Sequence, residues 1–265
     1  MGNAYEERLG TDRMLPLIFK MSLPAVAAQL VNLLYNIVDR IYIGHIPGIG
    51  TDALAGIGVT SAVIILISSF SAIVGAGGSP LAAIALGQGN RERAGQILGN
   101  GFILLLIFTI LTSATTYLFM EPILLFTGAS ENTIGYATDY LSIYLLGTLF
   151  VELSVGLNTF INTQGRPTIA MYSVLIGAIL NIGLDPLFIF TFGMGVKGAA
   201  LATILSQACS AIWVISFLTS KKASLRLEYR YMKLHKGIIL SILALGVSPF
   251  IMASTESLVG FVLNS

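Results

Sequence analysis

Long apolar runs separated by short polar breaks are the main feature of this chain of 265 residues. A hydrocarbon core about 30 Å thick is crossed by a helix of about 20 apolar residues. The pattern predicts six complete membrane-spanning helices and the start of a seventh, over residues 15–44, 53–86, 96–120, 132–162, 168–192, 197–219 and 237–265. The expected fold class is therefore an all-α integral membrane protein.

Composition agrees with a membrane protein, because 55% of the residues are hydrophobic and 10% are charged, against roughly 25% charged in soluble domains. The two histidines, His45 and His235, fall on opposite sides of the membrane in this arrangement, which excludes a shared metal site. The segment GAGGSP at 75–80 lacks the strand and the lysine of a phosphate-binding loop. We therefore expect no enzyme and no cofactor, and interpret 75–80 as small residues that let helices pack closely.

Basic residues fall mainly in the breaks on one side of the predicted spans. The twelve on that side are Arg8, Arg13, Lys20, Arg91, Arg93, Arg166, Lys221, Lys222, Arg226, Arg230, Lys233 and Lys236. The positive-inside rule then predicts a multi-pass protein of the cell membrane with its N-terminus, residues 1–14, in the cytoplasm. We interpret the basic segment 221–236 as a cytoplasmic linker that sets this topology, and expect no nucleic-acid partner.

An internal repeat relates the first span to the seventh. When Pro24 is placed over Pro249, Asp39 falls on Asn264 and the polar positions between them also coincide, although chance alignment of two apolar helices is a rival explanation. Two halves of equal orientation, offset by 225 positions, predict a parent of about 450 residues. We therefore expect a truncated piece: one six-helix lobe at 15–220, the linker, and the first helix of a second lobe at 237–265.

Acidic residues inside the spans are the first functional candidates, because a charged group in hydrocarbon costs at least ~2.5 kcal/mol. They are Asp39, Glu152, Asp185 and Glu256. Asp39 ends a polar stripe on one face of the first span, made of Gln29, Asn32, Asn36 and Asp39 with Tyr35 adjacent. Such a stripe lines either a water-filled cavity or a hydrogen-bonded contact with another helix.

The fifth span offers a second set of oxygen atoms. Asn181 and Asp185 are four residues apart, hence on one face, and Pro186 removes a backbone donor and frees the carbonyl of Ile182. Thr203 lies early in the sixth span. At 1.5 Å per residue, Asp39, Asp185 and Thr203 each lie roughly 9–11 Å below the outer boundary, so they can share one layer.

Two carboxylates in one apolar pocket cannot both ionise cheaply, so the pair requires a bound cation or a proton. Carboxylate, amide and hydroxyl oxygens suit either Na⁺ or H⁺. Arg40 follows Asp39, but successive helix residues point about 100° apart, so we expect it to reach the interface rather than to serve as the counter-ion. Glu152, with Asn158 and Asn162 following at helical spacing, either faces substrate or forms a structural pair.

Three stretches resemble the multidrug and toxic compound extrusion (MATE) family: PLAAIALGQGNRERAGQILG at 80–99, NTQGRPTIAMYSVLIGAILNIGLDPLFIF at 162–190, and GMGVKGAALATILSQ at 193–207. The resemblance implies twelve helices in two six-helix lobes around a central cavity. It also implies export of drugs or toxic organic compounds, driven by Na⁺ or H⁺ as the coupling ion.

Carried over to this sequence, the resemblance implies a cation site at Asp39, Asn181, Asp185 and Thr203. Candidate cavity or substrate positions are Gln29, Asn32, Tyr35, Asn36 and Glu152, and candidate helix-bending positions are Pro24 and Pro186. The expected partners are the lipid bilayer, small organic substrates that we expect to be cationic, and a C-terminal lobe of the same polypeptide.

Two other functions stay open from the sequence alone. A lipid-linked oligosaccharide flippase of the same superfamily would need a cationic cavity, and Arg40 is the intramembrane base that the sequence offers. A non-transporting membrane fragment is the other, because one lobe cannot rock against a second that is missing.

Overall fold

The computed structural model describes residues 14–264, so the expected N-terminal segment 1–14 lies outside the described residues except for Met14. The helical elements are α2 (Met14–Gly44), α3 (Gly50–Gly87), α4 (Arg91–Leu118), α5 (Met120–Phe126), α6 (Ile134–Thr163), α7 (Pro167–Pro186), the π-helix η1 (Leu187–Thr191), α8 (Val196–Thr219), the 3₁₀-helix η2 (Tyr229–Tyr231) and α9 (Lys236–Asn264). Seven helical segments of the described part are long and apolar enough to cross a membrane. The all-α membrane fold class is confirmed.

Helix boundaries differ from the expected spans where side chains or short elements intervene. Helix α4 begins at Arg91, before the expected residue 96, because the Asn90 side chain accepts a hydrogen bond from the backbone N–H of Arg93 at 2.9 Å and caps the helix. The short helix α5 was not predicted, because a search for membrane spans does not detect seven residues. The fifth span is divided at Pro186 into α7 and the π-helix η1.

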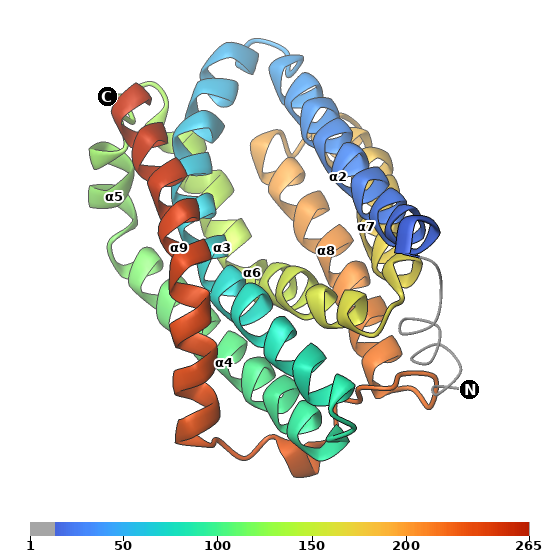
Figure 1. The fold of residues 1–265 in the computed structure, drawn as a ribbon. Coiled ribbons are helices and arrows are strands. Elements are labelled where there is room, and N and C mark those ends of the chain that lie inside the picture. The colour runs from blue at the N-terminus through green and yellow to red at the C-terminus, as the bar shows by residue number, and fades with distance from the viewer. Residues whose placement is uncertain (1–13, 265) are drawn as a thin grey trace.

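Helices that adjoin in sequence are not always neighbours in space. Helix α2 packs mainly along α7 and much less on α3, while α3 lies against α9, α6 and α4. Figure 1 shows the resulting arrangement, with α2 and α7 together on one side of the molecule and α9 beside α3 on the other. Helices α6 and α8 pack against each other between these two pairs.

Glycines allow α3 to approach its neighbours closely, as expected for segment 75–80. A Cβ atom on Gly77 would lie 2.2 Å from the carbonyl oxygen of Ile242 on α9, and one on Gly246 would lie 2.3 Å from the carbonyl oxygen of Ile73. A Cβ atom on Gly78 would lie 2.8 Å from the Phe160 ring on α6. Backbone contact through small residues is the usual means of helix association in lipid, where burial of apolar surface provides no driving force.

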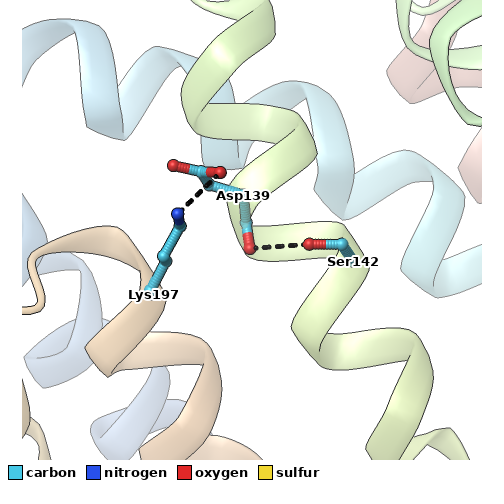
Figure 2. A network of polar contacts seen from close by, with 3 residues as sticks. All are labelled: Asp139, Ser142 and Lys197. Atoms are coloured by element: carbon cyan, nitrogen blue, oxygen red, sulfur yellow. Dashed lines mark hydrogen bonds and ion pairs between the residues drawn. The ribbon is translucent and has the colours of Figure 1, made fainter.

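Charged side chains gather at the two ends of the bundle. The segment between α8 and α9 runs along the end at which α4, α7 and α9 begin (Figure 1). At the other end, Lys197 pairs with Asp139, with Nζ 3.3 Å from Oδ1, and the Asp139 carbonyl accepts a hydrogen bond from Ser142, as Figure 2 shows. Both side chains of the pair are about half exposed, so this surface ion pair contributes little stability.

We predict that Gly77→Ala destabilises the chain by about 1–3 kcal/mol, because the added methyl group collides with the backbone of α9. Gly58→Ala, on the same helix, is the matched control, since a Cβ there meets nothing within 4 Å. Thermal unfolding in detergent, followed by far-UV circular dichroism, measures the difference. Equal unfolding temperatures for the two variants would contradict close α3–α9 packing.

Candidate functional site

The structure contains a cavity of about 610 Å³ lined by α2, α3, α6, α7 and α8. The whole polar stripe of α2 reaches it: Gln29, Asn32, Tyr35, Asn36 and Asp39 are all lining residues. The stripe is thus placed at a cavity rather than only in a contact between helices. Pro24 lies inside α2, one turn before this stripe begins.

Beside the cavity, α7 and α8 bring together three of the predicted cation-site residues. The Asn181 side chain donates from Nδ2 to Asp185 Oδ1 at 3.2 Å and, over a longer 3.5 Å contact, to Thr203 Oγ1. Asn181 and Asp185 lie one turn apart on the buried face of α7, and Asp185 is 0% exposed. A single amide group therefore holds a carboxylate and a hydroxyl from two helices in place.

Asp39 completes this cluster from α2. The packing of α2 along α7 brings the Asp39 carboxyl group close enough to interact directly with that of Asp185. Asp39 and Thr203 also line the cavity, whereas Asn181 and Asp185 lie behind them. We call Asp39, Asn181, Asp185 and Thr203 the cation cluster.

Three buried oxygen atoms of the cation cluster have no hydrogen-bond partner among the described residues: Asp39 Oδ1, Asn181 Oδ1 and Asp185 Oδ2. A buried acceptor without a partner costs about 1–3 kcal/mol, more when it is charged. Carboxylate and carbonyl oxygens are the ligands that Na⁺ and other hard cations take. The residues present therefore fit a small cation, and a proton shared between the two carboxyl groups would satisfy Asp39 Oδ1 and Asp185 Oδ2 but not Asn181 Oδ1.

The end of α7 shapes this cluster locally. Proline has no backbone N–H and cannot make the next α-helical hydrogen bond, and α7 ends at Pro186, directly after Asp185. The chain continues as the π-helix η1. Single π-helical turns are rare and occur often at functional sites. From the proline we expected a bend within one continuous span at 168–192, and the change to a π-helix was not foreseen.

Glu152, on α6, is separate from the cation cluster. It does not line the cavity and is 1% exposed, and neither carboxyl oxygen has a hydrogen-bond partner among the described residues. The neighbouring Asn158 and Asn162 do line the cavity. The side chain of Glu256 lies outside the described residues.

Several cavity residues were missed by the sequence reasoning. Helix α6 presents Tyr140, Tyr144 and Ser154 to the cavity, and α8 presents Gln207, whose Oε1 accepts a hydrogen bond from Ser154 at 2.7 Å. The cavity-lining positions of α6 recur at helical spacing, which could have indicated this face from the sequence. Apolar residues lie between its polar side chains, so they do not form a continuous polar stripe like that of α2. Arg40 also lines the cavity and interacts with Asp39, in addition to being exposed.

A family model described as MatE matches residues 24–187, which is more than half of the chain. The chain belongs to the MatE family. It is 28% identical to the multidrug export protein MepA of Staphylococcus haemolyticus, over 92% of this chain and 53% of that protein. The chain spans about half the length of the curated relatives it matches.

Solved structures show the same relationship. A multidrug resistance MATE family transporter in an inward-facing conformation superimposes with a TM-score of 0.81 at 26% identity, over 92% of this chain and 55% of that chain. A MATE structure in a bent conformation also has a TM-score of 0.81, at 28% identity, over 89% of this chain and 52% of that one. Because the family members named here are transporters, they confirm the expectation that this chain is not an enzyme.

We predict that the stability of the chain depends on a cation bound at the cation cluster. A ligand bound only by the folded state stabilises it by about 2.7 kcal/mol at 100 times its Kd. Unfolding temperature should therefore rise with sodium, tested against choline, or, if protons bind instead, as the pH falls. Differential scanning fluorimetry in detergent measures both responses.

Asp185→Asn should remove this response, whereas Asp139→Asn should keep it, because Asp139 pairs with Lys197 and does not line the cavity. A response that persists in Asp185→Asn, or none to either ion in the unmodified chain, would refute the assignment.

Proposed function

We propose that this chain provides the N-terminal lobe of a cation-coupled antiporter that exports drugs or toxic organic compounds. In this proposal residues 15–220 form the lobe, 221–236 a cytoplasmic linker, and 237–265 the first helix of a second lobe. The N-terminus lies in the cytoplasm and the protein resides in the plasma membrane. The observation that carries the proposal is the cation cluster with its unpartnered oxygens beside a cavity.

Asp39 connects ion binding to substrate binding, because it belongs both to the cation cluster and to the cavity wall. An ionised Asp39 attracts a cationic substrate, and a Na⁺ or H⁺ held between Asp39 and Asp185 neutralises that attraction. Ion and substrate then compete for one charge. Competition of this kind makes the entry of one favour the release of the other, which is the requirement for antiport.

The cavity is suited to small organic cations. Its volume of about 610 Å³ lies within the range of roughly 300–1,000 Å³ for drug-sized ligands. Tyr35, Tyr140 and Tyr144 supply aromatic faces, which attract ammonium groups by about 0.5–2 kcal/mol each. Amide and hydroxyl groups from α2, α6 and α8 provide hydrogen bonds without fixing one shape of ligand.

A lipid-linked oligosaccharide flippase is the second candidate, and the composition of the cavity disfavours it. A pyrophosphate group requires several cations, whereas Arg40 is the one basic residue among the described lining residues and interacts with Asp39. The match to export proteins and multidrug transporters also favours the antiporter over a fragment without transport activity.

We predict that Asp39→Asn and Asp185→Asn each reduce cation-driven drug efflux to background, because each removes one of the two charges that bind the coupling ion. The test uses everted membrane vesicles carrying a polypeptide in which this lobe is joined to a second six-helix lobe, with sodium and proton gradients imposed separately. Asp52→Asn, at an exposed acid in the first turn of α3, is the control. Efflux that keeps its cation dependence in both variants would exclude the coupling role.

A further inference from the structure

The segment between α8 and α9, residues 220–235, is held against the helices by hydrogen bonds with buried side chains. Asn100 of α4 is 0% exposed, and its side chain binds the backbone of this segment twice. Nδ2 donates to the Lys233 carbonyl at 3.0 Å, and Oδ1 accepts from the His235 N–H at 2.8 Å. We call residues 220–235 the strap.

A second buried amide holds the other half of the strap. Gln164, 1% exposed at the end of α6, accepts a hydrogen bond from the Leu225 N–H at 3.1 Å. The side chains of Ala223, Leu225 and Leu227 are buried in the largest hydrophobic cluster of the lobe. The backbone that carries the basic residues of the strap is therefore held in a defined position.

A pocket of about 310 Å³ lies between the strap and the first turns of α4. Its lining residues are Glu92 and Gln96 from α4, and Arg230, Tyr231, Lys233 and His235 from the strap. Tyr231 rests against Gly95, where a Cβ atom would lie 2.6 Å from its ring, and Arg230 stacks 4.5 Å from the centre of that ring. Packing against α4 therefore holds the Tyr231 ring, and with it the stacked Arg230 guanidinium, in place.

The lining of the pocket carries two positive charges, on Arg230 and Lys233, and one negative charge, on Glu92. Arg230 uses Nε in its 2.7 Å ion pair with Glu228, and an arginine has five N–H donors in all. Lys233 is exposed, and Lys236 follows at the start of α9. Glu92 is the one acid among the lining residues, and Gln96 donates to it across 3.4 Å.

Apolar side chains surround this charge at the end of the bundle. Leu234 and Leu240 are about half exposed, and Tyr229 is 88% exposed. Exposed apolar and aromatic groups next to Lys and Arg are typical of a membrane–water interface, where basic pockets bind anionic lipid headgroups. A soluble phosphate would gain nothing from these apolar neighbours.

We infer that this pocket binds the phosphate of an anionic phospholipid, through Arg230 and Lys233, with the acyl chains lying along the exposed apolar face that begins at Leu240. The site is independent of drug transport and of the cation cluster. A bound lipid there holds the strap to α4 and thereby steadies the start of α9.

Native mass spectrometry of the full purified chain tests this inference by counting lipids retained with added phosphatidylglycerol. Arg230→Gln combined with Lys233→Gln should weaken binding roughly 30-fold, from two cations lost near the bilayer surface. Lys221→Gln combined with Lys222→Gln removes equal charge from exposed positions of the strap outside the pocket. That control should bind as the unmodified chain does; equal weakening in both double variants would overturn the site.

A second measurement needs no variant. Phosphatidylglycerol should raise the unfolding temperature of the unmodified chain, whereas phosphatidylcholine and inorganic phosphate should not. Stabilisation by inorganic phosphate to the same extent would identify a free-anion site, and equal stabilisation by phosphatidylcholine would identify a general lipid effect. Either result would overturn the proposal.

Discussion

Packing of α2 along α7 is the contact on which the cavity and the cation cluster depend. In hydrocarbon, a stripe of amides ending in a carboxylate cannot face lipid without a large cost in free energy. Because α2 packs against α7 rather than α3, its polar stripe lines the cavity, and the carboxyl group of Asp39 lies near that of Asp185. The same contact leaves three oxygen atoms of the cation cluster without hydrogen-bond partners among the described residues, and these are the atoms to which we propose that an ion binds.

Close backbone contact fixes the position of α3 against α9 and α6. Helix α3 meets α9 through Gly77 and Gly246 and meets α6 through Gly78, so its central position is defined by residues without side chains. Lipid supplies no hydrophobic force between helices, and fit between backbones replaces it. The cavity lies between this central helix and α2, α6, α7 and α8.

Charge at the ends of the bundle completes the arrangement. Many of the basic residues lie on the strap, and the buried amides of Asn100 and Gln164 fix its backbone. The basic side chains of the strap are therefore attached to a backbone with a defined position. At the opposite end, the base of Lys197 is balanced by Asp139. Away from these ends, the described spans contain the acids Asp39, Glu152 and Asp185, and the exposed Arg40 follows Asp39.

The sequence by itself determined the membrane class, the number of spans and the shared face of Asn181 and Asp185. These follow from hydropathy over about 20 residues and from 3.6 residues per turn, which are local properties. The constant rise per residue also predicted that Asp39, Asp185 and Thr203 could share one layer. Tertiary structure decided that α2 joins α7 and that Glu152 lies outside the cavity. It also decided that α6 lines the cavity and that Asn100 holds the strap. Each of these depends on how a helix is rotated toward distant partners, and such rotation is set by packing between residues far apart in the chain.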